Sequence, residues 1–232
     1  MGLMVVTGAT SGIGAAVAAR LELDGHQVAR WDISGPGQPV DVADEDSIRA
    51  AAERLERAPD GVVLAAGVSA MAPLTETTTE QWEHQMRVNT FGVFACLREL
   101  LPRMGAGGSV VVVASVAGLR AAPLLSAYCA SKFAAIGLVQ SVAIEQGPRG
   151  VRVNAVCPMY VRTPMQEREL GWESALRGIT PAKVLDGYVA RTPLGRIGSP
   201  EEIADAISFL LGHESRLMTG STVTVTGGAE LP

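Results

Sequence analysis

A short apolar run followed by three closely spaced glycines constrains the fold of this chain more than any other feature. Leu3 to Val6 is uniformly apolar, which is typical of a strand buried on both faces. Gly8, Gly12 and Gly14 follow it, and an alanine-rich segment from about Ile13 to Leu23 predicts a helix. A glycine-rich turn between a strand and a helix brings N–H groups and the positive end of the helix dipole toward an anion. The sequence therefore predicts a pyrophosphate site at this turn.

The alternation of apolar runs and helical segments continues along the chain. Further strands are predicted at about 26–32, 61–65, 109–115, 151–156 and 222–225. Strands and helices that alternate with short connections form a parallel sheet covered on both faces. We predict a single doubly wound α/β domain, a Rossmann fold, that spans residues 1–232 and contains a seven-stranded parallel sheet with helices on both faces.

One long segment departs from this alternation. From Pro158 to Ser199 the composition becomes a mixture of charged, aromatic and apolar residues, and the segment is too long for an ordinary connection. It is either a substrate lid or a mobile surface loop. Helix signals at about 166–170 and 181–190 favour a substrate lid at about 159–198.

Composition argues against several classes of function. The net charge is −5 and the 19 basic residues are spread along the chain, which argues against a nucleic-acid partner. Cys96, Cys129 and Cys157 have spacings that fit neither a metal site nor a disulfide framework. We therefore expect small buried thiols in a reducing compartment and no bound metal. Apolar runs are too short to span a bilayer and no signal peptide is evident, so we expect no membrane association and a cytoplasmic location.

Asp32 ends the second predicted strand, 18 residues after Gly14. In dinucleotide-binding folds a carboxylate at this place accepts hydrogen bonds from the adenosine ribose hydroxyls. The alternative is a turn aspartate, because the glycine- and proline-rich stretch 34–37 follows directly. Arg30 lies two residues earlier, and strand alternation puts it on the same side as Asp32, where it could pair with the carboxylate.

The segment from Ser126 to Ala135 contains a tyrosine and a lysine four residues apart. Its alanine-rich composition predicts a helix, in which Tyr128 and Lys132 share one face. An ammonium group about 4 Å from a phenol favours the phenolate and would lower the tyrosine pKa by about three units. A surface lysine beside a half-buried tyrosine is the commoner explanation of this spacing when it is taken alone.

Two further residues stand at characteristic distances from this pair. Ser115 precedes Tyr128 by 13 residues, and Asn89 precedes Ser115 by 26. Together with the segment Thr7 to Gly14, they resemble the short-chain dehydrogenase/reductase family from about residue 3 to about residue 228. The resemblance implies a catalytic set made of Asn89, Ser115, Tyr128 and Lys132. It also implies a dinucleotide site made of Thr7, Gly8, Ser11, Gly12, Ile13, Gly14, Asp32, Asp41, Val42, Ala66, Gly67, Tyr128, Lys132, Pro158, Val161 and Thr163.

The reaction that the resemblance implies is hydride transfer between NAD and a secondary alcohol or ketone. Tyr128, as phenolate, would take the alcohol proton, and Ser115 would hold the same oxygen. Lys132 would lower the tyrosine pKa and bind the nicotinamide ribose, while Asn89 would support a proton relay to solvent. The predicted lid resembles that of members acting on polyols, diols and sugar-derived alcohols. Family members pair through the helices that contain Asn89 and Tyr128, which implies a homotetramer.

Two other functions remain open at the level of sequence. A ketoacyl reductase acting on an acyl-carrier protein belongs to the same family, but it would usually use NADPH, against which Asp32 argues. A non-catalytic dinucleotide sensor would keep the fold and the glycines without needing the full catalytic set. The chain departs from the family pattern at Leu64 and Ala65, where asparagines usually brace the sheet, so those hydrogen bonds must be missing or replaced. It also departs at Met159, which stands in place of a glycine beside the nicotinamide.

Overall fold

Six parallel strands form the centre of the molecule, which a computed structural model describes for residues 1–35 and 39–229. In chain order they are β1 (Leu3–Thr7), β2 (Gln27–Trp31), β3 (Gly61–Leu64), β4 (Ser109–Val113), β5 (Arg152–Pro158) and β6 (Thr222–Val225). Their order across the sheet is β2-β1-β3-β4-β5-β6, and all neighbouring strands are parallel. Strands β1, β3 and β4 are buried along their whole length, which explains their almost uniformly apolar sequences.

The prediction of a seven-stranded sheet is wrong, because the described residues form six strands. The six apolar runs identified in the sequence account for all of them. A further strand would have to pair at an edge of the sheet, and the described residues between β2 and α2 form no strand. There Pro39 has no N–H to donate to a ladder, and a backbone hydrogen bond of 2.7 Å from Val40 to Asp32 ties the returning chain to the end of β2. Residues 36–38 of this turn lie outside the described residues.

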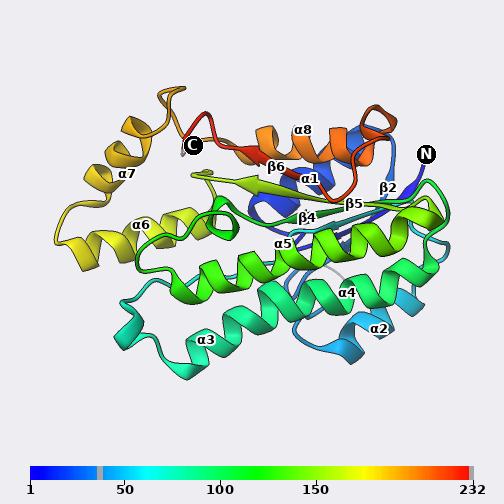
Figure 1. The fold of residues 1–232 in the computed structure, drawn as a ribbon, viewed down its shortest axis with the longest axis horizontal. Helices are drawn as coiled ribbons and strands as arrows, with labels where there is room; N and C mark the ends of the chain where they lie inside the picture. The colour runs from blue at the N-terminus through cyan, green and yellow to red at the C-terminus, as the bar shows by residue number, and fades with distance from the viewer. Residues whose placement is uncertain (36–38, 230–232) are drawn as a thin grey trace.

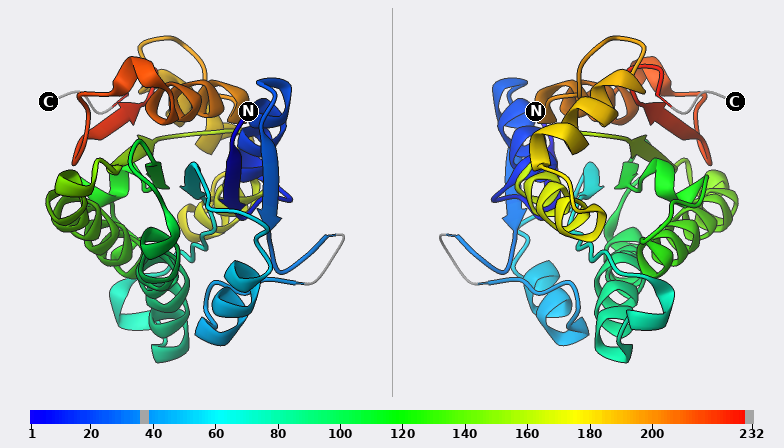
Figure 2. Two further views of the ribbon diagram at one scale, coloured as in Figure 1. Left: turned by 90° about the vertical axis from the view of Figure 1, so that its right-hand side faces the viewer. Right: turned by 90° about the vertical axis from the view of Figure 1, so that its left-hand side faces the viewer.

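Helices cover both faces of the sheet (Figures 1 and 2). On one face α1 (Gly12–Leu23) packs against α8 (Pro200–Leu211). The opposite layer contains α2 (Glu45–Glu53), α3 (Thr79–Met86), α4 (Gly92–Leu100) and α5 (Ser126–Gln146). Each layer buries an apolar cluster against the strands, so the core lies on both sides of the sheet. The three cysteines are buried and free, which confirms that they are small buried side chains.

A predicted helix is interrupted by a π-helical turn that contains Asn89. The sequence predicts a continuous helix from about Thr78 to Arg103, but a π-helical turn at Arg87–Phe91 separates α3 from α4. Such wide turns are rare and occur frequently at functional sites. Asn89 lies within this turn and is only 1% exposed.

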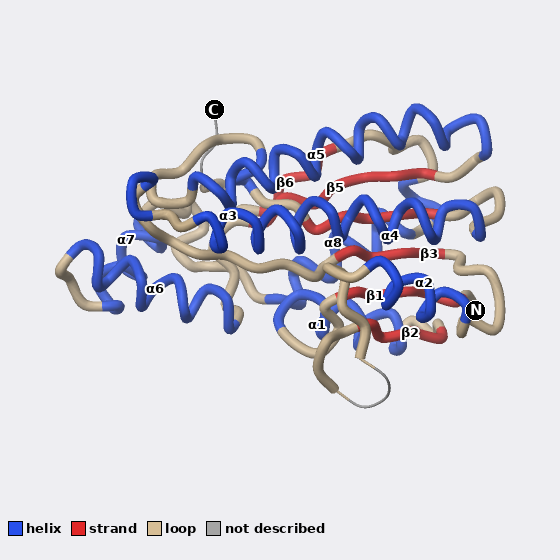
Figure 3. Tube along the Cα trace, turned by 90° about the horizontal axis from the view of Figure 1, so that it is seen from below, coloured by secondary structure: helices blue, strands red, loops and turns tan. Residues whose placement is uncertain are grey.

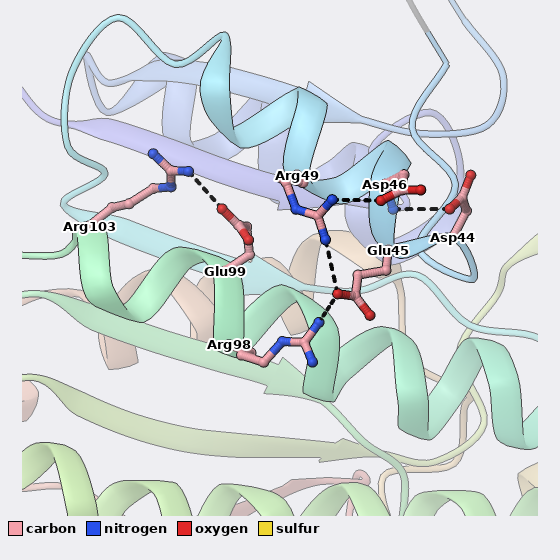
Figure 4. A network of polar contacts seen from close by, with 7 residues as sticks. All are labelled: Asp44, Glu45, Asp46, Arg49, Arg98, Glu99 and Arg103. Atoms are coloured by element: carbon pink, nitrogen blue, oxygen red, sulfur yellow. Dashed lines mark hydrogen bonds and ion pairs between the residues drawn. The ribbon is translucent and has the colours of Figure 1, made fainter.

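Surface ion pairs join α2 to α4 (Figure 4). Glu45 at the start of α2 pairs with Arg98 of α4 and, at 3.1 Å, with Arg49 on its own helix. Arg49 also contacts Asp46 at 2.6 Å, and the Asp44 carboxylate caps α2 by accepting a hydrogen bond from the Asp46 N–H. Because these groups are exposed to solvent, they contribute little to stability. The packing of α2 beside α4 is instead maintained by the buried apolar side chains that the two helices share, among them Ile48 and Leu97.

The segment predicted to be a lid forms a helical hairpin of α6 (Pro164–Arg177) and α7 (Pro181–Ala190), which projects beyond the carboxyl ends of the strands (Figures 1 and 3). Tyr160, just after β5, stacks on Tyr188 of α7 with ring centroids 4.1 Å apart. The Arg191 guanidinium lies 5.5 Å from both ring centroids. These contacts hold the α6–α7 hairpin against the end of β5.

Candidate active site

A cleft of about 1560 Å³ opens at the carboxyl ends of the strands and is bounded by the α6–α7 hairpin. It lies where the strand order reverses, with β2 on one side of β1 and β3 on the other. Ligands of open α/β sheets bind at such a reversal. A single small-molecule site usually has a volume of about 300 to 1000 Å³. The cleft therefore has room for a dinucleotide together with a second small molecule.

The glycine turn after β1 forms one end of the cleft. Gly8 and Gly12 have φ angles of 66° and 53°, and a Cβ atom at Gly14 would lie 2.1 Å from the Gly8 carbonyl oxygen. Within the described structure, the Ser11 side chain does not cap α1, and the first turn of α1 has no acidic side chain. The N–H groups of this turn are therefore available to an anion, and the turn fits a dinucleotide pyrophosphate.

Asp32 lies in the cleft just beyond β2, and both of its carboxylate oxygens accept hydrogen bonds. The Thr10 N–H donates to Oδ2 at 3.0 Å, while the N–H and the hydroxyl of Ser34 donate to Oδ1 at 3.1 Å. Burial raises the pKa of Asp32, but the hydrogen bonds from Ser34 and Thr10 together outweigh burial and hold the pKa below its usual value. The carboxylate is therefore negatively charged at neutral pH.

Arg30 does not pair with Asp32, contrary to one expectation from strand alternation. Its guanidinium binds Glu22 of α1 at 2.9 Å and donates to the Ala9 carbonyl oxygen at 3.1 Å. The Asp32 carboxylate is already engaged by the N–H groups of neighbouring turns. Arg30, the basic residue nearest in sequence to Asp32, thus has its charge balanced by the Glu22 carboxylate.

Most of the predicted dinucleotide residues lie on the cleft wall. Those that line it are Gly8, Ser11, Gly12, Ile13, Gly14, Asp32, Asp41, Val42, Ala66, Gly67, Tyr128, Lys132, Pro158, Val161 and Thr163. Thr7 instead lies beneath the turn: it is 2% exposed, and its hydroxyl accepts hydrogen bonds from the N–H groups of Ala65 and Ala66. Thr7 thus ties the end of β1 to the turn after β3 through hydrogen bonds to its backbone. Met159 also lines the cleft, with its backbone outside the left-handed region.

Ser115, Tyr128 and Lys132 meet at the other end of the cleft. Ser115 lies just beyond β4 and caps a short turn, its hydroxyl accepting a hydrogen bond from the Ala117 N–H at 3.1 Å. Gly118 lets this turn pack closely on α5, because a Cβ atom there would lie 2.7 Å from the Lys132 carbonyl oxygen. The close packing brings the Ser115 side chain near enough to Tyr128 to oppose the rise in the pKa of its phenol.

Lys132 is buried and lies under the tyrosine ring. Its Nζ donates to the Val113 carbonyl oxygen at 2.9 Å and lies 5.6 Å from the Tyr128 ring centroid. Burial lowers the pKa of Lys132 to about 8. Burial also raises the pKa of Tyr128, the charge of Glu169 adds to this rise, and the interaction with Ser115 opposes it. The chain's own groups therefore shift the tyrosine pKa upward, opposite to the direction expected from the Tyr128–Lys132 spacing.

Asn89 connects α5 to the turn after β3. Its amide group donates to the Ser131 hydroxyl and to the Val68 carbonyl oxygen, both at 2.9 Å, and its carbonyl accepts from the Val68 N–H at 2.9 Å. A Cβ atom at Gly67 would lie 3.3 Å from Asn89 Oδ1 and 3.6 Å from Lys132 Nζ. Asn89 thus fixes this turn beside the buried ammonium group.

The sequence predicts a substrate lid at about 159–198, but it does not single out the individual residues that line this end of the cleft, inside or outside that segment. They are Met71, His84, Arg120, Leu124, Gln166, Arg168, Glu169, Glu173, Arg177, Tyr188 and Arg191. A signal was present for three of them, because Gln166, Glu169 and Glu173 recur at intervals of three and four residues and therefore share one face of α6. Leu124 has a φ of 67°, a conformation that residues other than glycine seldom adopt. Such a conformation cannot be predicted from a leucine in the sequence.

Nearly the whole chain is similar to one family of known proteins. A family model described as enoyl-(acyl carrier protein) reductase matches residues 8–230. A short-chain dehydrogenase/reductase of Armillaria gallica is 36% identical over 250 residues, which cover 97% of this chain and 94% of the relative. The 3-oxoacyl-[acyl-carrier-protein] reductase of Thermotoga maritima is 34% identical over 246 residues, which cover 97% of this chain and 96% of the relative. The chain therefore belongs to the short-chain dehydrogenase/reductase family of oxidoreductases.

Solved structures of the same fold also match along the whole chain. The aldohexose dehydrogenase of Thermoplasma acidophilum has a TM-score of 0.91 and 29% identity, covering 100% of this chain and 96% of its own. An actinorhodin polyketide ketoreductase with NADPH has a TM-score of 0.91 and 29% identity, covering 98% and 96%. A 4-hydroxyisoleucine dehydrogenase complexed with NADH has a TM-score of 0.87 and 26% identity, covering 99% of each chain. Proteins of this fold thus bind nicotinamide dinucleotides with and without the 2′-phosphate.

The buried ammonium group of Lys132 predicts that stability depends on pH. Its pKa is about 8 in the folded chain, whereas an unfolded lysine titrates at about 10.4. Between these values the unfolded state binds more protons, so stability rises with pH there. Urea unfolding at about pH 7 and about pH 9.5 should show the wild type gaining about 2 kcal/mol relative to Lys132→Met. A stability difference that does not change with pH would contradict the burial of this charge.

Proposed function

We propose that this protein transfers a hydride between NAD and a secondary alcohol or ketone, and that its substrates are polyols, diols or sugar-derived alcohols. The observation that carries the proposal is the convergence of Ser115, Tyr128 and Lys132 in the same cleft as the glycine turn and Asp32. The similarity to an aldohexose dehydrogenase supports the substrate class. The glycine turn and Asp32 would hold the pyrophosphate and the adenosine ribose.

In this proposal the catalytic residues together remove the proton of the substrate hydroxyl group. Tyr128 as phenolate accepts the proton of the substrate hydroxyl, and Ser115 donates a hydrogen bond to the same oxygen, which keeps it beside the phenol. The positive charge of Lys132 under the ring favours the phenolate, and Asn89 holds the adjoining turn in place. When bound, the oxidised nicotinamide supplies the hydride acceptor and a further positive charge.

A ketoreductase acting on an acyl-carrier protein is the second candidate, favoured by the relative from Thermotoga maritima. Such enzymes usually take NADPH and need a basic entrance for the phosphopantetheine arm. Arginines do line the substrate end of the cleft, but Arg177 is paired with Glu173 at 2.5 Å. Burial raises the pKa of the nearby Glu169, and the positive charge of Arg168 opposes this rise. The cleft entrance therefore carries charges of both signs. A preference for NAD or for NADP distinguishes the two candidate functions.

We also propose that four copies of the chain assemble. The stretch Ser126–Arg149, which contains α5, is apolar enough in composition to cross a membrane, as core helices often are, and half of it is buried within the chain. Its outer face carries Phe133 and Ile144, which are 46% and 79% exposed, and neighbouring α4 exposes Phe94. A second copy that covers this face would remove these side chains from water.

Replacing Tyr128 with phenylalanine tests the proposed base. The substitution keeps the volume of the ring and removes the group that takes the proton, so turnover should fall by at least about a hundredfold. Cofactor affinity should change little, because the phenol hydroxyl acts mainly on the substrate. The absorbance of reduced nicotinamide measures turnover, and fluorescence titration measures cofactor affinity. If Tyr128→Phe kept most of its activity on a true substrate, the mechanism would be wrong.

The charged Asp32 predicts a preference for NAD over NADP. A 2′-phosphate carries about −1.5 to −2 charges, and the nearby Arg30 is already paired with Glu22. We expect kcat/KM with NAD to exceed that with NADP at least about tenfold, or about 1.4 kcal/mol. Asp32→Ala should shrink this preference by weakening NAD binding and relieving the repulsion of NADP. Equal or better kcat/KM with NADP in the unmodified protein would place Asp32 away from the ribose and favour the ketoreductase.

Light scattering tests the proposed tetramer. At micromolar concentration the measured mass should be about four times that of one chain. Aspartate at both Phe133 and Ile144 would bury charge in the proposed interface, so that variant should have a smaller mass. A monomeric mass for the unmodified protein would refute the proposal.

A further inference from the structure

Helix α6 carries a carboxylate for which the mechanism above has no use. Glu169 lines the substrate end of the cleft together with Tyr128 and is half-buried there. Its negative charge raises the pKa of Tyr128 and so opposes formation of the phenolate. A carboxylate that is costly to bury and works against the catalytic base marks a candidate functional residue.

The contacts of Glu169 leave part of its carboxylate available. Gln166 Nε2 donates to Oε2 at 3.4 Å. The buried Ser69 hydroxyl, from the loop after β3, influences the carboxylate but makes no close hydrogen bond within the described structure. Burial raises the pKa of Glu169, while Ser69 and the charge of Arg168 oppose this rise. A carboxylate has about four acceptor positions. The hydrogen bond from Gln166 therefore leaves acceptor capacity for a hydrogen bond from a ligand.

Glu173, one turn further along α6, shows a different arrangement. It pairs with Arg177 at 2.5 Å and accepts a hydrogen bond from the Tyr188 hydroxyl. Its charge is therefore used within the α6–α7 hairpin. Glu169, by contrast, acts across the cleft on the catalytic tyrosine.

The charges around Glu169 indicate which kind of substrate group it accepts. The charge of Arg168 already acts on Glu169 and Arg191 lines the same end of the cleft, so a cationic group would have to compete with arginine for this carboxylate. An anionic group would be repelled by Glu169 itself. A neutral hydroxyl group meets neither penalty, and its hydrogen bond to an ionised acceptor is stronger than one between neutral groups.

We propose that Glu169 determines specificity by accepting a hydrogen bond from a second hydroxyl group of the substrate, on a carbon close to the one that reacts. This inference rests on the proposed function, because Tyr128 must bind the reacting hydroxyl group. The preferred substrates are then diols, or hydroxyketones in the reverse direction, rather than simple alcohols.

Matched substrates and variants test the role of Glu169. Oxidation of cyclohexanol and of its vicinal cis-diol by NAD is measured for the wild type, Glu169→Ala and Glu167→Gln. The wild type should favour the diol at least about tenfold in kcat/KM, and Glu169→Ala should reduce this ratio to about threefold or less. Glu167 lies on the same helix but is exposed and outside the cleft, so Glu167→Gln should keep the wild-type ratio.

A pH profile separates recognition from a merely structural role. Glu169→Gln keeps the size of the side chain and an acceptor oxygen but removes the charge that raises the pKa of Tyr128. The acidic limb of kcat/KM for alcohol oxidation should therefore move to lower pH. The other titratable or charged groups that interact with Glu169 stay in place in this variant: Tyr128, Arg168, Glu173 and Tyr188.

The outcomes of these experiments distinguish the role of Glu169 from the proposed function. A diol preference that survives Glu169→Ala, an equal loss for both substrates, or an acidic limb that stays in place in Glu169→Gln would overturn the role of Glu169. Turnover of both substrates by the wild type without a diol preference would overturn it as well and leave the proposed function standing. Failure of the wild type to oxidise any alcohol or reduce any ketone with either nucleotide would contradict the proposed function itself.

Discussion

The reversal of strand order at β1 decides where this protein can bind a ligand. The chain crosses from β1 to β2 on one side and then from β2 to β3 on the other, so the two connections diverge and leave a cleft between them. Because all six described strands are parallel, the loops that follow them reach the same edge of the sheet. Gly67 after β3 and Ser115 after β4 therefore line one cleft with the glycine turn after β1.

Along this edge the chain controls three charges by different physical means. Hydrogen bonds from neighbouring N–H groups keep Asp32 ionised in spite of burial. Burial makes the ammonium group of Lys132 easier to deprotonate, and the Val113 carbonyl oxygen offsets part of its lost hydration. Burial also favours the protonated form of Glu169, which Ser69 and a neighbouring arginine counteract. The two ends of the cleft are thus polar for different purposes, which we propose are to bind the dinucleotide at one end and the substrate at the other.

Features with a local signal could be predicted from the sequence, and features that depend on packing could not. The buried strands, the glycine turn and the shared helical face of Tyr128 and Lys132 follow from spacing along the chain. The strand count failed at the sheet edge, where Pro39 cannot join a ladder. The partner of Arg30 and the influence of Glu169 on Tyr128 depend on how separate elements pack, and the spacing of residues along the chain does not reveal this.

We propose that a hydride passes directly from the carbinol carbon of an alcohol to nicotinamide in this cleft. The most direct measurement uses a secondary alcohol that carries deuterium on its carbinol carbon, with NAD as the acceptor. Proton NMR of the reduced cofactor then shows where the label has gone. Deuterium should be found on carbon four of the nicotinamide ring. Deuterium released to water, or oxidation of the alcohol without any label in the cofactor, would contradict this proposal.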